Sequence, residues 1–150
     1  MKKATNVLVG LLALYVVAIF VPFEPDAGRP GTRLGGSLAK AQDTDWSFLN
    51  DKNEIYVETQ TWYLIPHSVT TNSIVVDGAF YVPCGRCKTK RWPKNVQRDP
   101  RVRLKIDDKL YERTAVHITD ATQRRALLYK LTGGSAVDGV EIYRMDPRAE

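Results

Sequence analysis

A run of seventeen uncharged residues, 7–23, divides this chain into an apolar amino-terminal segment and a much more polar remainder. Together with residues 4–6 it can form about twenty helical residues, roughly the thickness of the hydrocarbon core of a bilayer. Lys2 and Lys3 precede the run. They favour an amino terminus in the cytoplasm and a translocated remainder. We therefore predict a membrane anchor over residues 1–23, with the rest of the chain on the extracytoplasmic side.

A cleaved signal peptide is the alternative for this segment. The apolar run is longer than most signal-peptide cores, and no small-x-small site follows it promptly, because the Pro-Phe-Glu-Pro sequence of residues 22–25 intervenes. The Ala-Lys-Ala sequence of residues 39–41 has the right form but lies well downstream. A buried core helix is the remaining interpretation, and an all-round apolar run at the chain terminus argues against it.

Residues 24–42 are rich in proline, glycine and small residues. This composition is typical of a flexible tether. We therefore predict a linker over residues 24–42 and one folded domain over residues 43–150. A domain of about one hundred residues can bury a single core. The two anchor lysines account for +2 of the net charge of +5, so the soluble part keeps a modest positive charge.

The domain begins with the alternation typical of β structure. Odd-numbered residues of the segment 54–62 are mainly apolar or threonine and even-numbered ones are mainly polar, which predicts a half-buried strand. Strands at 73–76 and 79–83 flank Asp77-Gly78, a strong hairpin signal. Strands at 101–106 and 109–118 flank Asp107-Asp108. Alternation in the first of these predicts that three cations form a solvated face, namely Arg101, Arg103 and Lys105.

One clear helix follows, over residues 120–132. Thr119 or Asp120 can cap it, with Gln123 at capping-box distance from Asp120, and Gly133-Gly134 can end it. A last strand is expected over residues 140–145. Five or six strands in hairpins, with a helix before the last, predict a mainly β (α+β) domain. We expect a small antiparallel barrel rather than a βαβ sheet.

Nine cations lie between Cys84 and Lys105, against a single anion, Asp99. Such a cluster attracts anions. Phosphate suits it, because arginine matches phosphate geometry and lysine supplies point charge. Strand alternation does not explain the cations of the loop, and we predict that these capture a phosphate. They are Arg86, Lys88, Lys90 and Arg91.

The sequence Trp-Pro-Lys-Asn-Val-Gln-Arg-Asp-Pro-Arg-Val of residues 92–102 follows an Asp-Gly hairpin and this basic loop, and precedes a strand pair and a helix. The arrangement resembles the split β-barrel flavin-binding superfamily, which contains pyridoxamine-phosphate-oxidase-like proteins and deazaflavin-dependent nitroreductases. The resemblance covers residues 54–145. It implies a split β-barrel with one or two helices, a phosphorylated cofactor (FMN or a deazaflavin), oxidoreductase activity, and a homodimer that completes the cofactor site.

By position, the resemblance implies that the basic loop holds the cofactor phosphate and that Trp92 and Asn95 fix the short helix after it. Packing and capping are the structural alternative for these two residues. No catalytic residue is assigned, because the cofactor would carry the chemistry. The candidate cofactor-binding residues are Arg86, Lys88, Lys90, Arg91, Trp92 and Asn95.

The sequence departs from the nitroreductase pattern at residues 62–72, where that branch usually carries a Gly-Arg-Lys-Ser-Gly-like turn. This stretch has no glycine, and its only potential cation is His67, which we expect in an exposed turn. The departure leaves a second hypothesis open. The chain would then be a non-catalytic exported barrel that binds an anionic ligand or an envelope partner.

Cys84 and Cys87 form a Cys-x-x-Cys motif, either a small disulfide or a reduced structural pair. A thioredoxin-like site would need a βαβ context, and a metal site would need more ligands than His67 and His117 supply. We predict neither. Nucleic-acid binding is not expected, because it needs a cytoplasmic domain and a stacking platform, and Trp92 is the only aromatic residue within the cluster. Anionic lipid near the anchor is a further candidate ligand of the cluster.

Overall fold

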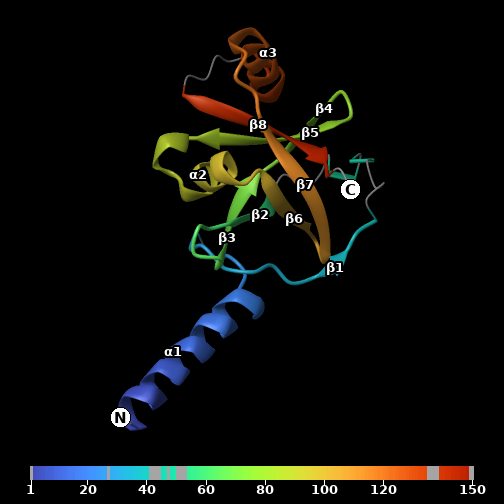
Figure 1. Ribbon diagram of the computed structural model, residues 1–150. Coiled ribbons are helices and arrows are strands. Elements are labelled where there is room, and N and C mark those ends of the chain that lie inside the picture. The colour runs from blue at the N-terminus through green and yellow to red at the C-terminus, as the bar shows by residue number, and fades with distance from the viewer. Residues whose placement is uncertain are drawn as a thin grey trace.

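The structure is a computed structural model that describes residues 2–26, 28–40, 45–46, 48–49, 54–134 and 139–148. In Figure 1, helix α1 projects away from a strongly curved sheet, and α3 lies at the far end of that sheet. The elements in chain order are α1 (Lys2–Phe20), β1 (Ser37–Leu38), β2 (Glu54–Gln60), β3 (Pro66–Asn72), β4 (Ile74–Val76), β5 (Ala79–Gly85), η2 (Cys87–Thr89), α2 (Arg91–Arg98), β6 (Arg101–Ile106), β7 (Lys109–His117), α3 (Ala121–Thr132) and β8 (Val140–Pro147).

Seven strands follow the order β3-β2-β6-β7-β8-β5-β4, and neighbours along this path are antiparallel. The eighth, β1, pairs in parallel with the first residues of β7, Lys109 and Leu110, while β8 pairs with β7 from Arg113 onward. Strand β3 also contacts β5, so the sheet curls into a small barrel. The predicted fold class, mainly β (α+β) with one or two helices in the barrel domain, is confirmed, and the helices are α2 and α3. The parallel β1–β7 pair is an addition to it.

The predicted turns and caps are present. Asp77 (φ 52°) and Gly78 (φ 77°) both adopt left-handed conformations, as a two-residue hairpin of the primed type requires. Asp107 (φ 53°) turns β6 into β7. The Oδ1 atom of Asp120 accepts a hydrogen bond from the backbone N–H of Gln123 at 2.6 Å, which caps α3. Local sequence signals therefore set these boundaries.

The main core lies inside the barrel and is rich in aromatic side chains. Trp92 packs edge-on against Tyr143 with ring centroids 4.9 Å apart, and Trp46 packs against Phe80 at 4.8 Å. A smaller cluster under α3 buries Leu127 and Leu128 together with Tyr81, Ile118 and Ile142. Two packed layers are thus formed, a filled barrel and a helix that covers one end of it.

Residues 28–40, which we call the strap, lie against the barrel. Leu34 is only 1% exposed. Its backbone N–H donates to Glu58 Oε2 at 2.6 Å, and its carbonyl accepts from Arg103 Nη2 at 2.6 Å. Gly31 pairs with Ser68 of β3, and a Cβ atom at Gly31 would lie 2.2 Å from the carbonyl oxygen of Phe23, so only glycine fits. These contacts differ from the free tether expected over residues 24–42.

The expected solvated face of β6 is wrong for two of its three cations. Arg103 forms an ion pair with Glu58 at 3.2 Å, and the Lys105 ammonium group pairs with Glu24 and, at 3.8 Å, with Asp108. Alternation identified the face of the strand, but a segment far away in sequence covers that face. Arg101 alone of the three predicted residues stays exposed.

A further correction concerns residues 62–72, expected as a turn. Most of them form β3, which pairs with β2 over its whole length, from Pro66 opposite Gln60 to Asn72 opposite Glu54. The predicted start of the folded domain, residue 43, lies outside the described residues. Helix α1 is long and apolar enough over residues 3–20 to cross a membrane, judged by length and composition, and no residue of that window is buried. The anchor remains a prediction.

Candidate functional site

The basic loop follows β5 and is tied by a disulfide between Cys84 and Cys87. Arg86, between the two cysteines, adopts a left-handed conformation with φ 51°. Two further hydrogen bonds close the loop, from Thr89 Oγ1 to the Arg86 carbonyl at 2.8 Å and from the Lys90 N–H to the Cys87 carbonyl at 3.0 Å. The question of a reduced or bridged pair is thereby answered, and the loop cations project from a short, closed backbone.

A hollow of about 500 Å³ lies beside the end of this loop. Three segments meet there: the start of the strap, the first half of β3, and the loop into α2. The lining residues are Gly28, Arg29, Pro30, His67, Val69, Thr70, Thr89, Lys90, Arg91 and Trp92. The structure thus brings three cations, two threonines and one histidine to the same concave surface.

Three of the six predicted site residues line this hollow, namely Lys90, Arg91 and Trp92. Trp92 is only 1% exposed, so it serves the core as well as the wall of the hollow. Arg86 and Lys88 are exposed on the same loop but lie outside the lining.

Asn95, the sixth predicted residue, is buried on α2 and holds the site together from behind. Its Nδ2 donates to Thr59 Oγ1 at 3.0 Å, and that hydroxyl donates to the carbonyl of His67 at 3.2 Å. The chain of bonds links α2, β2 and β3. It corresponds to the structural alternative for Asn95, a positioning role behind the hollow.

His67 is the main residue that the sequence analysis misplaced. It lies on β3 and is 8% exposed, not in an exposed turn. Burial lowers the pKa of its imidazole, and the nearby Arg91 guanidinium lowers the pKa further. The ring is therefore held neutral at physiological pH, with one nitrogen able to donate a hydrogen bond and the other able to accept one.

Arg91 connects the hollow to the β2–β3 connection. Its Nη1 donates to the hydroxyl of Tyr63 at 3.2 Å. Lys90, the residue before it, is the N-cap of α2 and makes no side-chain cap. The first amides of a helix lack intrahelical acceptors, and the positive end of the helix dipole favours an anion. The lysine, the arginine and the helix start therefore favour negative charge in the same place.

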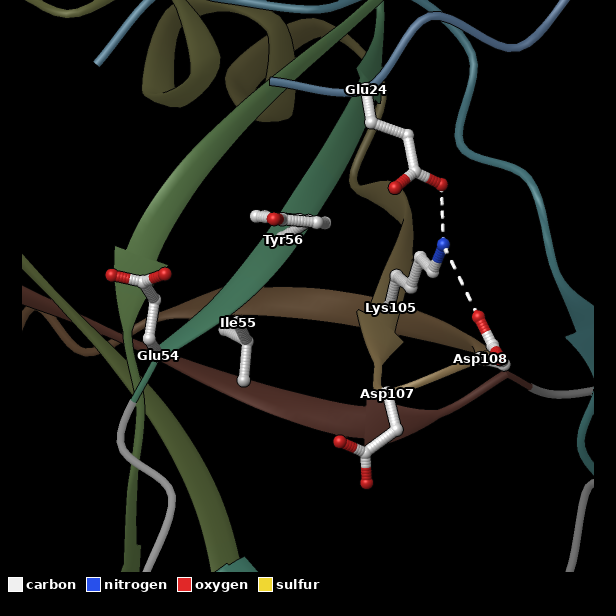
Figure 2. Close-up of a pocket in the computed structure, with 7 residues that line it drawn as sticks. All are labelled: Glu24, Glu54, Ile55, Tyr56, Lys105, Asp107 and Asp108. Atoms are coloured by element: carbon white, nitrogen blue, oxygen red, sulfur yellow. Dashed lines mark hydrogen bonds and ion pairs between the residues drawn. The ribbon is translucent and has the colours of Figure 1, made fainter. Parts of the chain in front are cut away.

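Two other hollows differ from this one in their lining residues. One of about 460 Å³ shares Thr70 and Lys90 with the first and extends beneath Leu128 and Leu131 of α3. Another, drawn in Figure 2, has the opposite character: Glu24 and Asp108 flank the ammonium group of Lys105, and carboxylates also stand at Glu54 and Asp107. An excess of carboxylates disfavours phosphate there. The first hollow, lined by Lys90 and Arg91, is the better candidate site for a phosphorylated ligand, and we call it the basic hollow.

No protein-family model matches the sequence, and no curated protein matches it. Several solved structures share its fold. One is a protein assigned as a pyridoxamine 5′-phosphate oxidase from Listeria innocua, with a TM-score of 0.56, 15% identity, and coverage of 69% of this chain and 90% of that chain. Another is HutZ, the heme storage protein of Vibrio cholerae, with a TM-score of 0.52, 12% identity, and coverage of 69% and 87%.

A third solved structure has a similar degree of likeness. It is a protein from Bacteroides thetaiotaomicron assigned as a 5-nitroimidazole antibiotic resistance protein, with a TM-score of 0.51, 13% identity, and coverage of 71% of this chain and 81% of that chain. At such identities the likeness concerns the fold alone. The chain therefore has the split β-barrel fold of the pyridoxamine-phosphate-oxidase-like proteins, as its sequence predicted.

Proposed function

We propose that this chain is a membrane-anchored split-barrel oxidoreductase that binds FMN, or a related phosphorylated flavin or deazaflavin, in the basic hollow. The observation that carries the proposal is the convergence of Lys90 and Arg91 with Thr70 and Thr89 around one cavity. Arginine and lysine are the usual partners of phosphate, and threonine hydroxyls can add neutral donors.

The residues of the hollow fit such a ligand. One part of the lining is cationic and suits a phosphate, while Pro30 and Val69 supply apolar surface that suits a flat ring. Ligand sites commonly measure about 300–1,000 Å³ and combine apolar walls with a few polar groups. The volume of about 500 Å³ lies in this range.

The chain's own residues would then bind and orient rather than react. Lys90 and Arg91 would hold the phosphate. His67, kept neutral by burial, could donate to or accept from a polar edge of the ring without adding charge. A bound flavin or deazaflavin would supply hydride or electron transfer. We also propose, from the resemblance alone, that a second copy of the chain completes the site.

A binding titration of the full-length protein tests the proposal. FMN, FAD and a deazaflavin are titrated by fluorescence, and haem by absorbance because of the likeness to HutZ. Lys90→Gln/Arg91→Gln should weaken flavin binding at least about tenfold, since each lost charge-assisted bond is worth about 1.5–3 kcal/mol. Lys94→Gln/Arg125→Gln removes the same charge from exposed positions outside the hollow and should bind like the wild type.

The alternative is a non-catalytic exported barrel that binds an anionic ligand or an envelope partner. The feature that favours it is the absence of the Gly-Arg turn in residues 62–72. Phosphate and pyrophosphate are therefore titrated beside the cofactors. Binding of these anions without binding of any cofactor would overturn the cofactor proposal and support the alternative. Saturable flavin binding without turnover by any reductant and acceptor pair would refute only the oxidoreductase activity.

A further inference from the structure

The connection between β2 and β3 exposes large apolar side chains to a degree unusual for a short hairpin. Trp62 is 77% exposed and Leu64 is 59% exposed. Tyr63 lies between them, with its ring 5.2 Å from that of Trp62. We call residues 62–64 the aromatic tip. A soluble hairpin ordinarily carries glycine or polar residues at such positions.

The backbone of the tip adds to this anomaly. Leu64 has φ 65°, in the left-handed region that a branched apolar residue rarely adopts. The turn is nonetheless well braced, because the Leu64 N–H donates to the Thr61 carbonyl at 3.2 Å and Thr61 Oγ1 donates to the Ile65 carbonyl at 2.6 Å. The fold therefore holds an apolar side chain outward in an unfavourable conformation, and such outliers point to a function.

A contact with helix α1 fixes the position of the tip relative to the end of that helix. The hydroxyl of Tyr15 donates to the carbonyl of Tyr63 at 2.6 Å, and in Figure 1 the β2–β3 connection lies beside the upper end of α1. Tyr15 precedes the helix end at Phe20 by five residues. At 1.5 Å per residue the Cα atom of Tyr15 lies about 7.5 Å from that end along the helix axis, and its long side chain reaches the tip. If α1 spans a bilayer, its end lies at the boundary between the hydrocarbon and the head groups, and the tip lies near that boundary.

Charges around the tip suit the same surroundings. The guanidinium of Arg91 contacts the Tyr63 hydroxyl, that of Arg98 donates to the carbonyl of Gln60, and Lys94 is exposed on the same helix. Tryptophan and tyrosine collect at the membrane interface, and lysine and arginine beside them attract anionic head groups. Phe20, the last residue of α1, and Phe23, three residues beyond it, are also more than 60% exposed, which suits lipid and not water.

We propose that the aromatic tip inserts into the surface of the bilayer that holds α1, with anionic phospholipid as its partner. The barrel is then held against the membrane at two points, the helix and the tip. This inference rests on the membrane-anchor part of the proposed function and does not depend on the cofactor.

Tryptophan fluorescence of the full-length protein in nanodiscs tests the proposal. Of the three tryptophans, Trp46 and Trp92 are buried and Trp62 is exposed, so Trp62 reports on its surroundings. Nanodiscs of phosphatidylcholine and phosphatidylglycerol are compared with nanodiscs in which the phosphatidylcholine has brominated acyl chains. We expect loss of the Trp62 emission on brominated lipid and little quenching by aqueous acrylamide. Trp62→Phe should abolish the brominated-lipid effect, and Trp46→Phe should keep it.

Charge is tested in the same assay. Brominated-lipid quenching should be greater with phosphatidylglycerol than without it, and the difference should shrink in Lys94→Gln but not in Arg125→Gln, an exposed cation on α3. If acrylamide quenches Trp62 and brominated lipid does not, the tip faces water and the proposal is wrong. If neither quencher reaches Trp62, another protein surface covers the tip, and the proposal is equally wrong.

Alkaline carbonate extraction of membranes from expressing cells separates the two levels of inference. Release of the chain would overturn the anchor and the tip insertion together. Retention of the chain with a water-exposed Trp62 would overturn the insertion alone. Neither result bears on the flavin titration, because that experiment measures the fluorescence of the cofactor.

Discussion

Leu34 and Glu58 are joined by a hydrogen bond of 2.6 Å from the backbone N–H of Leu34 to the carboxylate of Glu58, twenty-four residues away. The same carboxylate pairs with Arg103 at 3.2 Å, and Arg103 donates to the carbonyl of Leu34. Burial raises the pKa of Glu58, while the Leu34 N–H and Arg103 oppose that rise. One buried carboxylate therefore fastens the strap to β2 and β6.

Glu58→Ala should destabilise the protein by about 3 kcal/mol, because it leaves Arg103 partly buried without its counter-ion and Leu34 without its acceptor. Urea unfolding measures the loss. Glu58→Gln/Arg103→Met keeps an acceptor for Leu34 and removes both charges, so it should be less destabilised than Glu58→Ala. Equal loss in the two variants would show that the ion pair has no role in fastening the strap.

The disulfide between Cys84 and Cys87 should matter for binding more than for folding. The ring that it closes is short, so its removal should cost about 2 kcal/mol of unfolding free energy in the chain-entropy description. The loop backbone that precedes Lys90 would lose a constraint, and flavin affinity should fall.

The comparison is made between the wild type with and without dithiothreitol and the variant Cys84→Ala/Cys87→Ala. The variant should have the same flavin affinity as the reduced wild type, and dithiothreitol should not change it. Flavin affinity that is identical in all three states would mean that the disulfide does not shape the site.

Asn95→Ala should lower stability by about 1–3 kcal/mol, since Thr59 loses a buried hydrogen-bond partner. Flavin affinity should stay close to that of the wild type, because Asn95 lies behind the hollow. Thermal unfolding and flavin titration are measured together. Thr59→Val alone and combined with Asn95→Ala should show strong non-additivity, as expected for residues in one network. A large loss of affinity without a loss of stability would instead identify Asn95 as a ligand-contacting residue.

The pH dependence of stability should carry a contribution from His67. Its pKa is lowered in the folded protein, so below the ordinary value of about 6.5 the unfolded chain takes up a proton that the folded protein does not. Stability therefore falls as the pH falls through this window. Glu58, with its raised pKa, contributes with the opposite sign at lower pH.

His67→Gln isolates this contribution. The difference in urea midpoint between about pH 7.5 and about pH 5.5 should be smaller in the variant than in the wild type, because the variant has no imidazole to protonate. An unchanged difference would place the relevant proton on another group.

Local signals in the sequence were sufficient for much of the fold. The Asp77-Gly78 turn and the Asp120 cap depend on residues within a few positions of each other, and both were predicted correctly. Strand β3 was missed, because Pro66, His67 and Ser68 have no apolar alternation. All three are buried, and β3 contacts both the strap, at Ser68, and α2, which no local pattern reveals.

Some residues of the candidate site could likewise be predicted from the sequence, and others could not. Charge density along the chain identified Lys90 and Arg91, and the strand after them was recognised from alternation. The pattern of charges and alternation could not show that Arg103 and Lys105 are neutralised by Glu58 and Glu24, which are remote in sequence. Nor could it show that His67 and Thr70 complete the hollow. These assignments require the pairing of β2 with β3 and the path of the strap.

The strap has a consequence for where this protein can act. A free linker of the composition of residues 24–42 could extend roughly 60 Å from a membrane. Here Pro22 pairs with Arg33 and Gly31 pairs with Ser68 of β3, so the described part of this segment is folded back onto the barrel. In the membrane-anchored oxidoreductase that we propose, the domain would therefore stay close to the bilayer, and any partner or electron donor would have to come to that surface to meet it.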